Sequence, residues 1–344
     1  MLMGSVTRLG IIGVGRCGTY YLRTFNELKN ADVRWIAATR ESTMDDALRI
    51  IQPDNVPRKT TDYQKILQDP EVDAVAIATP GSTHFKLVKD ALLAGKHVLV
   101  EKPLAFSSHE ATQLANLANQ QKKTLMVGHL HLHNPPIQRL REDIQKGMFG
   151  KIQYIRSLGA GSGPIRTDMS AVWDFFPHDV SIALYLLDKF PASVCAHGSS
   201  YTQEGVEDIA TLSMFFDDST FVTSTCTWLD PLKKREVIVV GEKLSAVFDD
   251  YSSPDKLKYI KHFPSTDARK GLQQETDVHI PFVQKALPLT EELKHFLECV
   301  ETGAVPLTNG ENAVQVTRVL EAAHESIKRG GIRIAVPAAT YGTR

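Results

Sequence analysis

The 344-residue sequence lacks most of the features that mark a specialised class of protein. It has only four cysteines, Cys17, Cys195, Cys226 and Cys299, and no Cys-x-x-Cys pair. That pattern argues against a disulfide framework and a cysteine-based zinc site, and it suits a reducing compartment. The formal net charge is −1, so neither a nucleic acid nor an anionic membrane is expected as a partner.

Long apolar runs are also missing from the sequence. No uninterrupted apolar stretch reaches the ~20 residues that cross a bilayer. The early run 9–14 is short, rich in glycine and flanked by Arg8 and Arg16, unlike a signal peptide. Composition is that of an ordinary globular protein, with 42% hydrophobic and 23% charged residues. We therefore expect a cytoplasmic protein, and the length favours two domains.

Between residues 6 and 128, short apolar segments alternate with helical patterns. The expected strands are 6–13, 33–39, 72–79, 97–100 and 125–128, and the expected helices are 17–28, 84–93 and 109–121. This alternation predicts a parallel sheet that is covered by helices on both faces. Ligands bind such sheets at the carboxyl ends of the strands. Residues 13–18, 79–84 and 101–103 all fall at such ends.

A glycine-rich turn, Gly13-Val14-Gly15-Arg16-Cys17-Gly18, follows the first expected strand and opens the first expected helix. In this context Gly13 permits a tight turn, Gly15 lets a pyrophosphate approach the backbone, and Gly18 lets helix and strand pack closely. The first N–H groups of the helix would then bind the phosphates. We expect residues 1–128 to form a Rossmann dinucleotide-binding domain. The alternative is that the glycines only shape a turn.

The choice between NAD and NADP is made at the end of the second expected strand. An acidic residue about 20 positions after the glycine turn would bind the adenosine ribose of NAD. Thr39 and Arg40 stand there instead, and a hydroxyl beside a guanidinium suits the 2′-phosphate of NADP. The sequence therefore favours NADP over NAD. The alternative is that Arg40 is a solvated loop residue and that Glu41 or Asp45 supplies the acid.

The pattern changes in the second half of the chain. Period-two alternation predicts strands at 151–158, 193–199, 209–216, 221–228, 235–240 and 244–248, and helices are expected at 177–187, 291–300 and 311–328. Turn signals such as Asp217-Asp218-Ser219 join consecutive strands. Residues 129–344 should therefore form an α+β domain with a large, mostly antiparallel open sheet, and the whole chain is of the α/β class.

A candidate catalytic pair lies in the run Trp173-Asp174-Phe175-Phe176-Pro177-His178-Asp179. Asp174 and His178 share one face if a helix includes both, whereas a helix that begins at Pro177 leaves Asp174 just outside. A carboxylate near an imidazole raises its basicity and fixes its tautomer, which helps to move a hydroxyl proton. The alternative is a capping aspartate and a hydrogen-bonded core histidine.

Four segments together resemble the Gfo/Idh/MocA oxidoreductases, a family named for glucose-fructose oxidoreductase, inositol dehydrogenase and a rhizopine-catabolism protein. They are residues 13–18, Ala78-Thr79-Pro80 with His84, Glu101-Lys102-Pro103 and Asp174-x-x-x-His178. The resemblance covers nearly the whole chain, through Leu297-Glu298-Cys299-Val300-Glu301-Thr302-Gly303. It implies a Rossmann domain joined to an α/β domain whose sheet often forms the oligomer interface. A homodimer or homotetramer through the C-terminal sheet is therefore expected.

The resemblance also implies roles for individual residues. Lys102 would be the active-site lysine beside the nicotinamide and the reacting hydroxyl. His178 would accept or donate the proton, and Asp174 would be its neighbour on the substrate. Besides Lys102, the glycine turn, Thr39 and Arg40, the residues expected to line the cofactor are Thr79, Pro80, His84 and Glu101.

Residues 129–135 have two features that bear on the site: alternating histidines, and the absence of an arginine that many family members carry. His129, His131 and His133 alternate, so on a strand they would face one way. Substrate contacts, His129 above all, or ordinary sheet residues are expected there, and no metal. Many family members carry an arginine before the aromatic-x-Pro that follows Gly128, and here Leu132-His133-Asn134-Pro135 takes that place.

Further substrate contacts compete with structural roles. Arg166 and the run Lys233-Lys234-Arg235 could meet an anionic group, although a solvated turn after Pro231 explains the run nearly as well. Trp173 and Trp228 could stack on a sugar ring, although core packing is the commoner role of tryptophan.

The expected activity is hydride transfer between NAD(P) and a secondary alcohol or ketone of a sugar, cyclitol or nucleotide sugar. Two alternatives remain open at this point. One is an NAD-dependent glycosidase on the same scaffold, and the other is a non-catalytic regulator that senses a dinucleotide. Lys102, Asp174 and His178 occur together, which argues against the regulator because a binding module has no need for all three.

Overall fold

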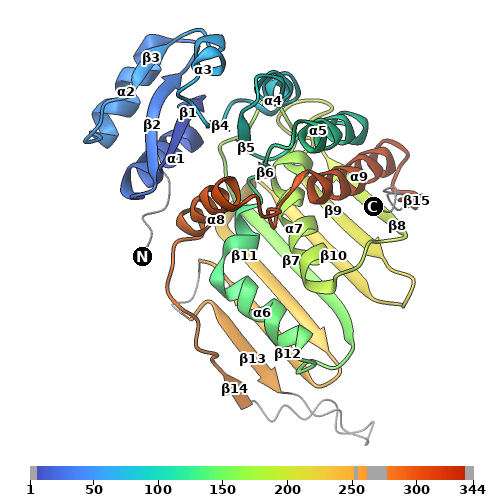
Figure 1. The fold of residues 1–344 in the computed structure, drawn as a ribbon. Coiled ribbons are helices and arrows are strands. Elements are labelled where there is room, and N and C mark those ends of the chain that lie inside the picture. The colour runs from blue at the N-terminus through green and yellow to red at the C-terminus, as the bar shows by residue number, and fades with distance from the viewer. Residues whose placement is uncertain (1–5, 252–254, 262–276, 338–344) are drawn as a thin grey trace, which may run out of the picture. The chain divides into compact units, whose positions relative to one another are not determined.

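The computed structural model describes residues 6–251, 255–261 and 277–337. The chain forms two compact units, Met1–His133 with Ala286–Thr317, and Asn134–Lys285 with Arg318–Arg344 (Figure 1). The predicted α/β class is confirmed, because one unit holds a parallel sheet and the other a mostly antiparallel sheet. The units differ from the predicted division after residue 128 chiefly in segment 286–317, which groups with the N-terminal unit.

The first unit is built on a six-stranded parallel sheet in the order β3-β2-β1-β4-β5-β6. Its strands are β1 (Thr7–Ile12), β2 (Ala31–Ala37), β3 (Arg58–Thr60), β4 (Ala74–Ile77), β5 (His97–Val100) and β6 (Leu125–Val127). Its helices are α1 (Arg16–Glu27), α2 (Glu41–Ile51), α3 (Gln64–Gln68), α4 (His84–Leu93), α5 (Ser108–Gln121), the short η1 (Gly81–Thr83) and η2 (Leu130–His133), α8 (Pro288–Thr302) and the start of α9 (Gly310–Lys328). This strand order confirms the predicted Rossmann domain.

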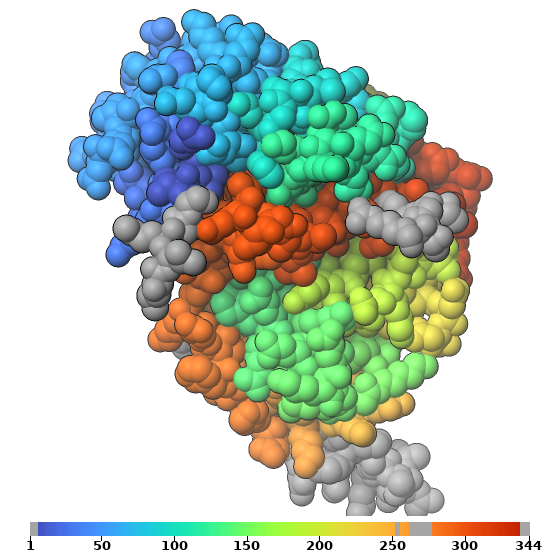
Figure 2. All heavy atoms as spheres, viewed as in Figure 1, coloured from blue at the N-terminus to red at the C-terminus, as the bar shows by residue number. Residues whose placement is uncertain are grey.

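Parallel strands need crossover connections, and helical crossovers cover both faces of such a sheet. Helices α4 and α5 pack against each other and lie side by side on the surface in the space-filling view (Figure 2). Helix α1 packs with α2 and α8. Of all the helices in the described part of the chain, none has the length and apolar character that crossing a membrane requires.

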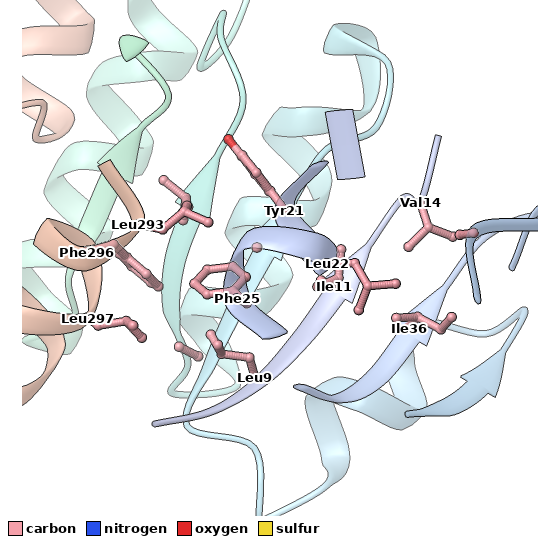
Figure 3. Packing of buried hydrophobic residues seen from close by; sticks show 14 of the residues in the cluster. Leu9, Ile11, Val14, Tyr21, Leu22, Phe25, Ile36, Leu293, Phe296 and Leu297 are labelled. Atoms are coloured by element: carbon pink, nitrogen blue, oxygen red, sulfur yellow. The ribbon is translucent and has the colours of Figure 1, made fainter. Parts of the chain in front are cut away.

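Helix α8 completes the core of the first unit, although it lies almost 300 residues along the chain. It starts with Pro288 and ends before Gly303, whose φ of +73° suits glycine. Leu293, Phe296 and Leu297 are fully buried in the same cluster as Leu9 and Phe25 (Figure 3). Each such side chain contributes about 1.5–3 kcal/mol by leaving water, which explains why this segment joins the first unit.

The second unit is built on a nine-stranded sheet in the order β14-β13-β12-β11-β7-β10-β9-β8-β15. All neighbouring strands are antiparallel except β10 and β7, so the predicted sheet is confirmed. The strands are β7 (Ile152–Ser162), β8 (Ser193–Ser199), β9 (Ile209–Phe215), β10 (Phe221–Thr227), β11 (Leu229–Gly241), β12 (Leu244–Asp249), β13 (Leu257–Lys261), β14 (Asp277–His279) and β15 (Ile334–Ala335). The helices are α6 (Pro135–Gln145), α7 (Ala171–Leu187) and the rest of α9.

Helix α7 begins at Ala171, six residues before the predicted start at Pro177. Pro177 therefore lies inside the helix rather than in its first turn. A proline in a helix interior loses one backbone hydrogen bond. The helix nevertheless extends toward its N-terminus because Val172 and Phe176 are fully buried there. As a result, Asp174 and His178 belong to one continuous helix.

Candidate active site

The glycine turn of the first unit provides space and hydrogen-bond donors for a dinucleotide. Gly13 has φ +90°, and a Cβ there would lie 2.7 Å from the carbonyl oxygen of Ala78. A Cβ on Gly18 would lie only 1.8 Å from the carbonyl oxygen of Gly13, so these two glycines are needed for packing. A Cβ on Gly15 would meet no atom within 4 Å. The open backbone at Gly15 thus fits a ligand that approaches it closely.

The N-terminus of α1 also fits a phosphate. No side chain caps this end, and the first turn contains no acidic residue. The first N–H groups of a helix have no partner within the helix and carry a partial positive charge. Among the residues of this turn, Arg16 and Cys17 are exposed. The residues present therefore fit the pyrophosphate of NAD or NADP.

Thr39 and Arg40 are exposed just beyond the end of β2, where the sequence predicted the choice of cofactor. Arg40 immediately precedes α2, a helix that the sequence analysis did not identify. Asp45 lies one turn into α2, and its carboxylate accepts a hydrogen bond of 2.5 Å from Lys59 Nζ. Of the two acids considered as alternatives, Asp45 is thus engaged elsewhere and Glu41 remains.

Residues 79–84 and 101–103 lie together at the carboxyl edge of the sheet. The ring of His84 is buried, with Nε2 2.9 Å from the carbonyl oxygen of Thr79 and Nδ1 2.7 Å from that of Pro103. The hydroxyls of Thr79 and Thr83 are 2.7 Å apart, and Thr83 Oγ1 donates to the carbonyl oxygen of Pro80. The methyl group of Thr79 lies beside Gly13. Three of the predicted cofactor segments are therefore in contact.

Glu101 and Lys102 follow β5 and are half-buried. Glu101 continues the pairing with β4, since its N–H donates to the carbonyl oxygen of Ile77 at 2.9 Å. His129 is buried nearby. Burial, and then the positive charge of Lys102, lower the pKa of the His129 imidazole from 6.5 to about 3. Neither ring nitrogen of His129 has a hydrogen-bond partner in the described residues, so its predicted contact with substrate stays a prediction.

His129, His131 and His133 do not lie on a strand, which was the condition under which their side chains would face one way. These residues precede or form η2, a short 3-10 helix, so the three rings do not line up on one face of a sheet. The chain leaves β6 at Val127 and starts α6 at Pro135, and a proline cannot donate to a strand ladder. Within residues 6–251, 255–261 and 277–337, no three His, Cys, Asp or Glu side chains gather as metal ligands would.

Sequence reasoning missed two buried groups next to Glu101. Glu292 of α8 is 1% exposed, and burial and the Glu101 charge raise its pKa well above the usual 4.5. Tyr21 of α1 is buried too, and burial and the same charge raise the pKa of its phenol. A Cβ on Gly128 would lie 3.2 Å from Tyr21 Oη and 3.4 Å from Glu101 Oε2. The sequence signal that could have identified Glu292 is the position of this acid on the apolar face of α8, three residues after Leu289.

In the second unit, Asp174 and His178 are half-buried and lie four residues apart on α7. This spacing puts both side chains on one face of the helix, as predicted for a continuous helix. Arg166 Nη1 lies 3.5 Å from Asp174 Oδ1, and Arg166 Nε and Nη2 donate to both oxygens of Asp168. The Arg166 guanidinium, a predicted anion contact, is thus held beside the catalytic candidate by two carboxylates.

The residue after His178 anchors α7 to the sheet. Asp179 is buried and accepts hydrogen bonds from Arg235 Nη1 at 2.6 Å and from Ser224 Oγ at 2.9 Å. The suggestion that Arg235 lies in a solvated turn or meets an anionic substrate is wrong, because its side chain is 5% exposed in β11. The local sequence pattern could not identify Asp179 as the partner of Arg235.

The two tryptophans considered for sugar stacking are both buried. Trp228 is 2% exposed, and its indole N–H donates to Asp208. Trp228 is therefore a core residue, and the suggestion that it stacks on a sugar ring is wrong. Trp173 is buried in the first turn of α7, and its contact with substrate stays a prediction.

Comparison with known proteins supports a single family over both units. Residues 7–129 match the model described as oxidoreductase family, NAD-binding Rossmann fold, and residues 137–247 match the GFO/IDH/MocA C-terminal domain. A UDP-N-acetylglucosamine 3-dehydrogenase from Acidithiobacillus ferrooxidans is 28% identical over 334 residues, which cover 96% of this chain and 97% of that protein.

Solved structures agree in fold over almost the whole chain. One from Magnetospirillum magnetotacticum has a TM-score of 0.80 at 30% identity and covers 92% of this chain and 99% of its own. A levoglucosan dehydrogenase in complex with NADH has a TM-score of 0.83 at 20% identity, with 97% and 100% covered. The protein belongs to the Gfo/Idh/MocA family of NAD-binding oxidoreductases.

Proposed function

We propose that the protein is an NAD(P)-dependent dehydrogenase acting on a secondary alcohol or ketone of a sugar, cyclitol or nucleotide sugar. The observation that carries this proposal is the edge of the first sheet, where contacts through Thr79 and His84 join the dinucleotide turn to the segment bearing Lys102. The named relative acting on a nucleotide sugar supports the substrate class.

Each proposed catalytic residue has one task. Bound nicotinamide supplies the acceptor for the hydride. The ammonium of Lys102 stabilises the negative charge that develops on the reacting oxygen. His178 takes up the hydroxyl proton and passes it to solvent. Asp174, on the same face of α7, holds a substrate hydroxyl and favours the protonated imidazole.

Mutation of Lys102 and of His178 tests this proposal. Lys102→Ala and His178→Ala should each lower kcat by at least ~100-fold, the usual scale for a positioned acid–base group. Binding of NADH or NADPH, followed by nicotinamide fluorescence, should survive in both. Lys65→Ala and His197→Ala, at exposed positions, are matched controls and should keep normal turnover. Near-normal turnover in Lys102→Ala or His178→Ala would remove that residue from the mechanism.

We further propose that the cofactor is NADP rather than NAD. The support is the pair of exposed side chains Thr39 and Arg40 and the engagement of Asp45 by Lys59. Arg40→Ala should weaken NADPH binding by about tenfold or more and leave NADH binding nearly unchanged, because a guanidinium–phosphate contact is lost. Equal dissociation constants for both cofactors in the unaltered protein and in Arg40→Ala would contradict this preference.

One assay separates the dehydrogenase from the two alternatives. A panel of sugars, cyclitols and nucleotide sugars is incubated with NAD and with NADP, and nicotinamide absorbance and product are both measured. A dehydrogenase reduces one equivalent of cofactor for each alcohol that it oxidises. A glycosidase gives net hydrolysis without net absorbance change, and a regulator binds the dinucleotide without turnover.

We also propose a cytoplasmic homo-oligomer that assembles through the nine-stranded sheet. The four cysteines are thiols in the structure, which suits a reducing compartment. Tyr154, Ile238 and Val240 face the same side of the sheet in register, and Tyr154 is exposed. The double variant Tyr154→Asp with Ile238→Lys should dissociate the oligomer in analytical ultracentrifugation. A monomeric unaltered protein would contradict the proposal.

A further inference from the structure

The buried ring of His84 has an unusual pair of partners. Only 1% of this residue is exposed, and each ring nitrogen lies within hydrogen-bond distance of a backbone carbonyl. The oxygen of Pro103 is 2.7 Å from Nδ1, and the oxygen of Thr79 is 2.9 Å from Nε2. Both partners are acceptors, and neither can donate a proton.

A neutral imidazole can satisfy only one of these carbonyls. It carries a single N–H, so its second nitrogen would direct a lone pair at a carbonyl oxygen. The doubly protonated ring donates to both oxygens, and hydrogen bonds from a charged donor are the stronger kind. Burial opposes the charge, whereas hydrogen bonds to the charged form favour it. Two contacts of 2.7 and 2.9 Å on a fixed backbone select the charged ring.

Two other histidines of the first unit show the opposite arrangement. His97 Nδ1 accepts a hydrogen bond from the backbone N–H of Thr124 at 3.1 Å, and His295 Nε2 accepts one from that of Leu307 at 2.9 Å. An accepting nitrogen cannot carry a proton, so both rings are neutral. Burial correspondingly lowers the pKa of His97 to about 4 and also lowers the pKa of His295. The backbone partner of each ring thus indicates its protonation state.

We propose that His84 is a doubly protonated imidazolium that positions Lys102 by holding the carbonyls of Thr79 and Pro103. Pro103 directly follows Lys102, and Thr79 contacts Gly13 in the dinucleotide turn. His84 starts α4, and it ties together the two loops that leave β4 and β5. The charged residues Glu101 and Lys102 directly precede Pro103 in the chain. The positioning role rests on the proposed dehydrogenase function, whereas the protonation state does not.

Nitrogen NMR of the full-length protein labelled with ¹⁵N-histidine tests the protonation state. An imidazolium gives two similar ring-nitrogen signals, each coupled to a bound proton, whereas a neutral ring gives two widely separated signals. At pH 7.5 we expect the charged pattern for His84 and the neutral pattern for His97, the internal control. His84→Gln assigns the signal by its loss, and through-bond correlations assign it if that variant does not fold. A neutral pattern for His84 would overturn the proposal, whatever the catalytic activity.

Kinetics test the positioning role. His84→Gln can hold only one of the two carbonyls well, so we expect kcat to fall about tenfold while KM for the alcohol changes less than about threefold. His97→Gln is the matched control, because an amide oxygen can still accept from Thr124, and its kcat should stay within about twofold. An unchanged kcat in a folded His84→Gln variant would refute the positioning role. If Lys102→Ala loses turnover while kcat is unchanged in His84→Gln, the dehydrogenase function is supported and the positioning role of His84 is refuted.

Discussion

Two sets of buried titratable groups, one in each unit, have different surroundings. Near the candidate site of the first unit, burial and a neighbouring like charge shift the pKa of Glu292 and the pKa of His129 toward the neutral form. In the second unit, Asp179 is buried against Arg235, and Asp143 against Arg139. A neutral buried group makes stability depend on pH, whereas a buried ion pair makes stability depend on the presence of the partner.

The largest loss of stability is expected when the buried Asp179–Arg235 ion pair of the second unit is broken. Arg235→Met leaves the Asp179 carboxylate buried without its cation, which should lower the free energy of unfolding by about 3–5 kcal/mol in chemical denaturation. Arg329→Met is the matched control in the same unit. Its guanidinium is 56% exposed and 3.7 Å from Glu325, so the loss should be below ~1 kcal/mol.

A double variant sharpens this result. Asp179→Leu combined with Arg235→Met removes both charges and should recover most of the stability that Arg235→Met loses. Equal destabilisation by Arg235→Met and Arg329→Met would contradict the claim that the second unit depends on a buried pair.

The next effect tests the opposite side of the comparison. Burial and the Glu101 charge raise the pKa of the Glu292 carboxyl above its unfolded value, so the folded state loses stability as pH rises above 4.5. Glu292→Gln cannot ionise and should therefore be more stable than the unaltered protein at pH 7.5. The difference should vanish by pH 4. Glu298→Gln, on the same helix and 70% exposed, should give no such pH-dependent gap.

The smallest effect is the loss of stability at low pH that the buried His129 causes. The folded pKa of His129 is about 3 against 6.5 when unfolded, so the folded state loses about 1.4 kcal/mol per pH unit as pH falls below 6.5. Relative to His129→Gln, the unaltered protein should therefore lose about 2 kcal/mol between pH 7.5 and pH 5. Thermal unfolding at both pH values measures this, with the exposed His109→Gln as control. Parallel pH curves for the unaltered protein and His129→Gln would count against neutral burial.

Local signals were enough for most of the fold. Helix α4 and strands β5 and β8 have the predicted bounds, because their periodicity is local and a stop signal such as Gly95 lies just beyond the end of α4. Helix α6 was missed although Asn134 before two prolines is an ordinary helix start. The start of α7 was misplaced for another reason. Pro177 is a local signal, and the burial of Val172 and Phe176 that overrides it depends on the sheet they pack against.

The residues of the candidate site likewise fall into those that local sequence signals identify and those that only the fold brings together. The glycine turn and Lys102 carry their function in residue type and spacing, so the sequence could identify them. Glu292 could not be found that way, because its neighbour Glu101 is 191 positions earlier and only the fold brings them together. Arg235 was misassigned for the same reason, since its partner Asp179 is 56 positions away.

Helix α8 has a consequence for biosynthesis. The segment that covers Leu9 and Phe25 is made only after eight of the nine strands of the second sheet, β7 to β14, have been synthesised. Until then the N-terminal portion exposes apolar side chains that native packing would shield, and domains that expose such surface are prone to aggregate. A fragment ending at His133 should therefore be poorly soluble, and adding residues 286–317 as a separate peptide should rescue it.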